Sequence, residues 1–213
     1  TLMGGTQWQI STTCFGSTTP LLTYVPDDNF ENYLEANGMG DGIALNNYVY
    51  TSAIDTATNL DVNNQSISDI TGIEDFTALI YLNCEVNQIT SLDVSPNIAL
   101  VELRCRNNQL TSINVSNNTA LTYLECDENQ LTSLDVSNNI NLISFSCYNN
   151  QLTSLDVSNN TALNELDCFD NQLTSLDVSN NTILTAFAVR GNYLTSLDVS
   201  SNTALTGFDC GDN

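Results

Sequence analysis

Apolar residues recur over most of the chain in a pattern that repeats every 21 residues, and residues 121–141 show it clearly. Within that unit, apolar and polar positions alternate around Leu124 and Cys126, and again around Leu134 and Val136. Alternation with a period of two indicates a half-buried strand, and self-similarity at this spacing is typical of a stacked solenoid. We therefore predict a mainly parallel β solenoid with two ladders of strands back to back, named here the Cys side and the Val side after these inward residues.

The segment before the repeats has a different pattern. Residues 1–21 share nothing with the repeats and lack the basic and continuous apolar parts of a signal peptide, so we interpret them as a leader or linker. Residues 22–66 are predicted to form an N-terminal cap. In this cap Pro26 starts a short amphipathic helix that ends near Gly38, and Leu60 opens the first strand of the solenoid.

Residues 67–213 are predicted to be the leucine-rich part of the chain, with six full units at 79–204 and a partial seventh unit. We predict no C-terminal cap within this sequence. Because an uncapped end exposes core side chains to water, we expect the native chain to continue into further repeats or a C-terminal module.

Six of the seven cysteines fall on the 21-residue register, and Val189 fills its one vacancy. Their side chains are expected to point the same way into the core, which does not allow neighbouring units to form disulfides. The chain also has no His and no CxxC pair for a zinc site. We predict an accessible thiol at Cys14, off the register, and buried, reduced thiols at Cys84, Cys105, Cys126, Cys147, Cys168 and Cys210.

Two asparagines recur in every full unit, at the positions of Asn129 and Asn139. Backbone groups at the corners of a solenoid have no partner in a neighbouring strand and need one from elsewhere. We expect both asparagine columns to turn inward and to hydrogen-bond these groups.

The chain has 25 acidic and 3 basic residues, and its net charge is −22. Almost no cations are present to replace phosphate counterions, which disfavours nucleic acid and anionic membranes as partners. No run of about 18 apolar residues is present to insert into a bilayer.

Without His or Lys the sequence cannot supply Ser-His-Asp, Schiff-base or P-loop chemistry. The chemistry that remains is that of carboxylates. Glu165 and Asp167 would lie about 7 Å apart on one strand, within the range of glycosidases. We predict that the protein is not an enzyme, and a carbohydrate-active enzyme that uses surface carboxylates is the less favoured alternative.

The outward Val-side positions change little from unit to unit and form columns of Ser and Asp. Neighbouring carboxylates about 4.8 Å apart repel one another unless hydrogen bonds or cations intervene. We favour hydrogen bonds from the flanking Ser and Thr residues. The alternative is Ca²⁺ bound by Asp135, Asp156 and Asp177, and no other cofactor is predicted.

The outward Cys-side positions differ between units, whereas residues fixed by folding repeat. All three basic residues fall on this side among aromatic side chains, and both types are enriched at binding hot spots. The alternative is that these positions differ only because a repeat surface without a ligand varies by neutral drift. We predict a face that binds a protein or glycan, made of Tyr81, Arg104, Arg106, Tyr123, Glu125, Asp127, Tyr148, Phe169 and Arg190.

These motifs resemble a known family. The first half of each unit matches the pattern L-x-x-L-x-[L/C]-x-x-N-x-L of leucine-rich repeats. Repeats of the form LTSLDVSNNTALTYLECxxNQ, preceded by YVPDDNFENYLE and DITGIEDFTALIYLNC, resemble the secreted and cell-surface leucine-rich repeat proteins of Bacteroidetes, especially flavobacteria.

The resemblance covers residues 24–213. It implies export, often with a C-terminal type IX sorting domain, a role in surface binding or adhesion, and no common catalytic residues. We expect a non-catalytic secreted or cell-surface recognition module. A structural spacer or stalk within a larger exported protein is the main alternative.

Overall fold

The computed structural model describes residues 19–213. The predictions for most of the leader or linker, and for the thiol of Cys14, therefore lie outside the described residues. None of the helices in the described part has the length and apolar character that crossing a bilayer requires.

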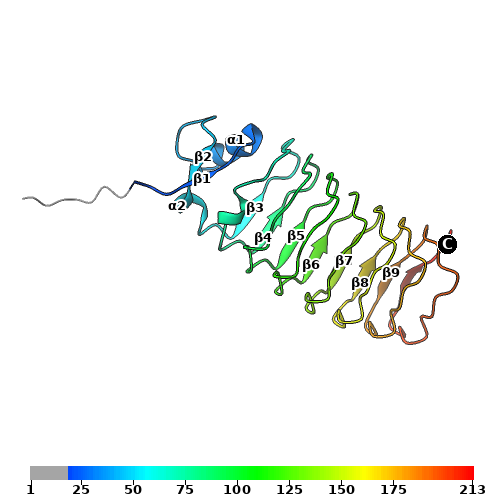
Figure 1. Ribbon diagram of the computed structural model, residues 1–213. Coiled ribbons are helices and arrows are strands. Elements are labelled where there is room, and N and C mark those ends of the chain that lie inside the picture. Colours follow the sequence, from blue (N-terminus) through cyan, green and yellow to red (C-terminus); the bar gives the residue numbers. More distant parts are fainter. Residues whose placement is uncertain (1–18) are drawn as a thin grey trace, which may run out of the picture.

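From residue 59 onward the chain winds into a stack of parallel turns, here called rungs (Figure 1). Register partners are 22 residues apart between β3 and β4 and 21 residues apart between later strands. Each rung gives one short strand to a single parallel sheet, and the strands lie side by side in chain order. The central residue of every strand from β3 to β9 is buried, and Leu103 pairs in register with Leu82 and Leu124. This confirms the predicted solenoid. Its strands are β3 (Asn59–Asp61), β4 (Tyr81–Asn83), β5 (Glu102–Arg104), β6 (Tyr123–Glu125), β7 (Ser144–Ser146), β8 (Glu165–Asp167), β9 (Ala186–Ala188) and β10 (Gly207–Asp209).

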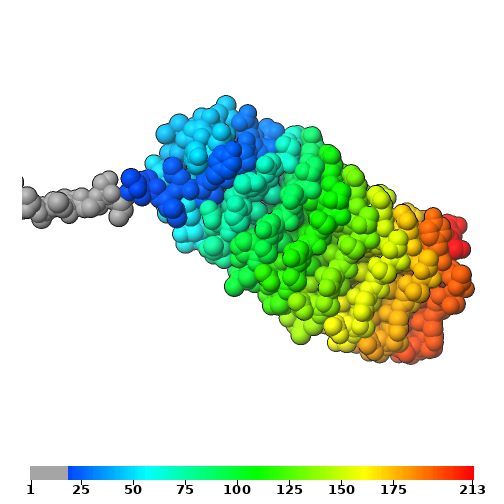
Figure 2. All heavy atoms as spheres, viewed as in Figure 1, coloured from blue at the N-terminus to red at the C-terminus, as the bar shows by residue number. Residues whose placement is uncertain are grey.

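A small cap covers the N-terminal end of the stack (Figures 1 and 2). Helix α1 lies within the segment predicted to be helical and buries Phe30 and Leu34. Asp27 caps its first turn by accepting from the amides of Asn29 and Phe30. The other carboxylate oxygen of Asp27 accepts from the amide and the hydroxyl of Ser68, both at 2.8 Å, and so holds the cap on the first rung. The cap contains β1 (Leu22–Tyr24), α1 (Asp28–Ala36), β2 (Tyr48–Tyr50) and α2 (Thr51–Ile54), and the 3-10 helix η1 (Ile73–Asp75) follows β3.

The register cysteines form one column of the core. Five of them, from Cys84 to Cys168, are fully buried and unpaired, as predicted. The thiol of Cys105 donates to the carbonyl oxygen of Glu125 in the next rung at 3.3 Å, and burial raises the pKa of Cys84 to about 12. Cys210 is also unpaired, but its predicted burial is wrong, because this thiol is exposed in the last described rung.

The asparagine column at the Cys-side corner ties adjacent rungs together. Asn129 Nδ2 lies 3.0 Å from the carbonyl oxygen of Cys105 in the preceding rung and 3.1 Å from that of Cys126 in its own. Its Oδ1 accepts from the amide of Leu110 at 3.0 Å. One buried side chain therefore replaces several ladder hydrogen bonds where no strand reaches. The same three contacts recur at Asn108, Asn150, Asn171 and Asn192.

The second predicted ladder of strands is wrong, since the described residues form no strand on the Val side. Side chains hydrogen-bond to the backbone amides and carbonyls there instead. Asp135 Oδ1 accepts from the amide of Ser137 at 2.9 Å. Asn139 Nδ2 donates to two carbonyl oxygens of the preceding rung, those of Val115 at 3.0 Å and Asn118 at 2.9 Å. These bonds use backbone groups that a parallel strand needs, so the chain stays irregular between turns, while the asparagines turn inward as predicted.

We expect Asn129→Ala to lower the free energy of unfolding by about 2–4 kcal/mol, because buried backbone groups in two rungs lose their partner. Asn138 is the matched control, since it is exposed and bonds only the carbonyl oxygen of Ser116. Asn138→Ala should change the free energy by less than about 0.5 kcal/mol. Urea unfolding followed by circular dichroism measures both, and equal effects would show that the buried column does not stabilise the stack.

We expect the five buried thiols to ignore a thiol reagent in the native protein and to react once the chain is unfolded without reductant, because burial keeps them protonated and out of reach. Cys210→Ser should reduce the native thiol count by one and leave the count protected by folding unchanged. Internal disulfides in the intact mass, or rapid native reaction of all the thiols, would contradict this expectation.

Candidate functional site

The predicted ligand-binding residues all lie on the outward Cys side of the sheet. Four of them belong to strands β4 to β6, namely Tyr81, Arg104, Tyr123 and Glu125. The other five lie two residues after the end of a strand, where the chain turns away from the sheet: Arg106, Asp127, Tyr148, Phe169 and Arg190. The structure brings the nine residues together into two arginine clusters and a stacked column.

The first cluster surrounds Arg104. Its Nε lies 2.6 Å from Oε1 of Glu102, and its Nη1 lies 3.7 Å from Oε2 of Glu125 on the next strand. The guanidinium also lies over the ring of Tyr123, 4.7 Å from the centroid, and the Tyr123 hydroxyl donates to Glu125. Burial, followed by this hydrogen bond, raises the pKa of Tyr123. Tyr81 borders the cluster, in register with Glu102.

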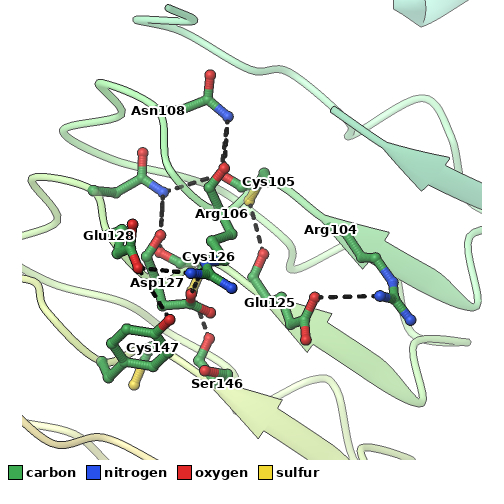
Figure 3. A network of polar contacts seen from close by, with 12 residues as sticks. Arg104, Cys105, Arg106, Asn108, Glu125, Cys126, Asp127, Glu128, Ser146 and Cys147 are labelled. Carbon is green, nitrogen blue, oxygen red and sulfur yellow. Dashed lines mark hydrogen bonds and ion pairs between the residues drawn. The ribbon is translucent and has the colours of Figure 1, made fainter. Parts of the chain in front are cut away.

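The second cluster surrounds Arg106 and spans three rungs (Figure 3). Arg106 Nε lies 3.2 Å from Oδ2 of Asp127, and Nη2 lies 2.8 Å from Oε1 of Glu128. The same Glu128 oxygen accepts from the hydroxyl of Tyr148 at 3.1 Å. The guanidinium carbon of Arg106 lies 5.8 Å from the centroid of the Tyr148 ring. Arg106 is therefore bound within the molecule on three sides.

The carboxylate of Asp127 is buried, which contradicts the prediction that it faces solvent. Its side chain is 1% exposed, because Arg106 reaches across it toward Tyr148. Neither carboxylate oxygen accepts a hydrogen bond. Burial raises the pKa of Asp127, although the nearby Ser146 and the charge of Arg106 act in the opposite direction.

Aromatic and cationic side chains continue the column beyond this cluster. The rings of Tyr148 and Phe169 stack with centroids 4.2 Å apart and planes inclined by 8°. Arg190 covers the far side of the pair, 5.1 Å from the Phe169 centroid, and its Nε lies 3.7 Å from Oδ2 of Asp209. The column Arg106, Tyr148, Phe169, Arg190 is thus one continuous stack along the solenoid axis.

The sequence prediction missed Glu128. Its backbone has a φ of 52°, at a corner position where the neighbouring rungs carry Asn107 and Asn149 with similar angles. This left-handed turn, rare for a non-glycine residue, brings the carboxylate back over the sheet face to Arg106. The signal was available, since Glu128 is the one glutamate in a corner column otherwise made of Val, Asn, Asp and Gly.

The carboxylates proposed as a catalytic pair lie on an open surface. Glu165 is exposed and Asp167 is half-buried on strand β8, and burial, followed by the charge of Glu165, raises the pKa of Asp167. Beside Asp167 the sheet has a shallow recess of about 260 Å³ floored by Ala186, Ala188 and Gly207. This surface can accept a side chain, but it does not enclose a sugar chain away from water.

The Val-side carboxylates are hydrogen-bonded within their own rungs. The Oδ1 atoms of Asp135, Asp156 and Asp177 each accept from the amide of the serine two residues later, at 2.9 Å. Hydrogen bonds from these serines lower the pKa of all three carboxyls. Within residues 19–213 no three acidic, Cys or His side chains gather closely enough to hold a metal ion. Calcium on these residues therefore stays a prediction without a formed site.

Comparison with known proteins places this geometry in context. No family model matches the chain. Over 96 residues it is 42% identical to internalin J of Listeria monocytogenes, a stretch that is 45% of this chain and 10% of that protein. The chain thus spans a tenth of this curated relative.

Solved structures have a similar fold. A leucine-rich repeat protein of Leptospira interrogans aligns with a TM-score of 0.70 at 22% identity, over 76% of this chain and 45% of that chain. The functional domain of internalin J, described as including a cysteine ladder, aligns with a TM-score of 0.49 at 32% identity, over 90% of this chain and 57% of that chain. The chain has a solenoid fold like that of leucine-rich repeat proteins, and over 96 residues its sequence is similar to that of a Listeria internalin.

The raised pKa of Asp127 predicts a pH dependence of stability. A carboxyl whose folded pKa exceeds its unfolded value binds more protons in the folded state, so stability falls as pH rises through the interval between the two values. Asp127→Asn removes this loss. We expect the melting temperature of the variant, relative to wild type, to increase between about pH 4 and pH 7.

Asp156→Asn is the control for this measurement. Serine hydrogen bonds lower the pKa of Asp156, so its contribution is lost only as pH falls below the ordinary aspartate range. Above about pH 4 the difference in melting temperature between Asp156→Asn and wild type should be constant. If the difference in melting temperature between wild type and Asp127→Asn is the same at every pH in this range, the pKa of Asp127 is not raised.

Proposed function

We propose that this leucine-rich repeat solenoid is a non-catalytic recognition or adhesion module of an exported or cell-surface protein, and that it binds a protein or glycan with the Cys side of its sheet. The observation that carries the proposal is the gathering of all three arginines with Tyr123, Tyr148 and Phe169 on this one face. These residue types dominate binding hot spots.

The different roles of inward and outward residues within each rung support the proposal. The inward leucines, cysteines and asparagines repeat because packing and backbone hydrogen bonding require them. The outward Cys-side residues make no such contribution, yet each of the six rungs from β4 to β9 carries at least one arginine or aromatic side chain among them. A surface that only had to remain soluble could carry the Ser and Asp of the Val side in every rung.

The export route belongs to the same proposal. The resemblance of the repeats to Bacteroidetes surface proteins supports secretion or display on the outer surface, with a type IX sorting domain as the expected signal. The partial likeness to internalin J supports a module of a larger protein. We do not extend the proposal to catalysis, because Glu165 and Asp167 lie on an open face.

The proposal predicts that Tyr123→Ala and Tyr148→Ala each weaken binding of a partner by about 1–2 kcal/mol, because each removes an aromatic side chain from the centre of the face. Arg106→Ala is a poorer test, since it leaves the buried carboxylate of Asp127 without its counter-ion. A panel of purified extracellular proteins and glycans, probed with wild type and both variants, gives the measurement.

The control is a variant of the opposite face. Asp93→Asn and Asp198→Asn keep the local turn, since Asn114 already makes the same bond to the amide of Ser116 in that column. These variants should bind as wild type does. A spacer role predicts that no member of the panel binds, and recognition by the Val side predicts that only the control variants lose binding.

A further inference from the structure

Every arginine of this chain is neutralised within the molecule. Each guanidinium has at least one carboxylate oxygen within 4 Å, in the pairs Arg104–Glu102, Arg104–Glu125, Arg106–Asp127, Arg106–Glu128 and Arg190–Asp209. An acidic partner therefore meets no free cation on the Cys side. The charge that remains after this pairing is negative.

The aromatic faces are also occupied. Tyr148 and Phe169 cover one another at 4.2 Å, and Arg106 and Arg190 cover the outer faces of the pair. Arg104 lies over the ring of Tyr123. A sugar ring stacks on an open aromatic face, and both outer faces of the Tyr148–Phe169 pair are covered by arginines. The column therefore does not form the platform that a glycan needs.

Some carboxylates on this face lack a sufficient counter-ion. Burial, followed by the charge of Glu125, raises the pKa of Glu85, and burial, followed by the charge of Glu165, raises the pKa of Asp167. On the Val side the opposite holds, and hydrogen bonds from Ser179 lower the pKa of Asp177. An added cation relieves repulsion on the Cys side and meets satisfied carboxylates on the Val side.

Asp127 is an independent sign of the same deficit. Its buried carboxylate points into the Arg106 cluster (Figure 3), and neither oxygen accepts a hydrogen bond. Glu128 and Asp127 share the single guanidinium of Arg106. A buried charge without hydrogen bonds is costly. Because only 1% of the Asp127 side chain is exposed, an added cation has to bind elsewhere on this face.

The sheet offers space for such a cation at its other end. Asp167 and Asp209 lie in one column, on either side of Ala188. The recess between them is floored by small side chains and holds about 260 Å³. An aliphatic stem can lie on this floor while its charged end reaches either carboxylate, which is how Lys and Arg side chains bind partly apolar surfaces.

We propose that the Cys side binds a basic polypeptide segment, of which a Lys or Arg side chain lies in the recess between Asp167 and Asp209. This inference rests on the proposed recognition function and names the class of partner. Complementary charge of this kind speeds association and selects against acidic partners.

The test uses short synthetic peptides in which Lys, Glu or neutral Gln alternates with Ser, titrated onto the full chain by calorimetry. The Lys peptide should bind, the Glu and Gln peptides should not, and raising the salt concentration should weaken binding because exposed charges are screened. Asp167→Asn with Asp209→Asn should weaken it roughly 5–10-fold.

Asp93→Asn with Asp198→Asn is the matched control, because it removes two charges from the opposite face. This pair should weaken binding by less than about twofold, the share expected from net charge alone. Equal weakening by both pairs, or no binding of the Lys peptide, overturns the proposal. If the Cys-side pair fails to fold in a thermal melt, Asp167→Asn alone decides.

The proposal and the broader recognition function fail in different ways. A partner from the extracellular panel that is a neutral glycan or an acidic protein, and that Tyr123→Ala weakens, leaves recognition by the Cys side intact and refutes a basic partner. If the wild-type chain binds no member of the panel, recognition itself is refuted.

Discussion

Hydrogen bonding of the backbone at the corners of each rung is the constraint on which the rest of this structure depends. Strands of three residues satisfy only a small part of a 21-residue turn. Backbone bonds between rungs satisfy some of the remaining groups, and several buried amides and carbonyls at the corners have only side chains as partners. Asn129 and Asn139 supply those partners from side chains: Asn139 reaches into the preceding rung, and Asn129 reaches into the preceding rung and its own. Because each unit depends on the unit before it, the asparagines must keep the same spacing along the whole stack.

This constraint leaves one surface free. The inward positions are fixed by packing, and the Val-side positions are fixed in part by the Asp to Ser hydrogen bonds that close each turn. The outward Cys-side residues carry neither task, since their strand already has its backbone partners on both sides. Variation can accumulate there without loss of the fold, and that is where Arg104, Arg106 and Arg190 lie.

The same type of side chain has opposite electrostatic states on the two faces. Asp156 accepts a hydrogen bond from its own turn and its pKa is lowered. Asp127 is covered by Arg106 and Tyr148, accepts no hydrogen bond, and its pKa is raised. Local turn geometry decides the first case and contacts between rungs decide the second. A count of acidic residues therefore says little about which face attracts a cation, whereas the distribution of hydrogen-bond donors does.

The sequence by itself determined the parallel solenoid, the inward cysteines from Cys84 to Cys168 and both asparagine columns, because periodic residues at a fixed spacing must occupy equivalent places in a stack. It also placed the candidate binding residues on one face. Only the tertiary structure decided that the Val side forms no strands, that Asp127 is buried and that Glu128 turns back to Arg106. Those outcomes depend on side chains from neighbouring rungs competing for the same backbone groups and charges, and a one-dimensional pattern does not contain that competition.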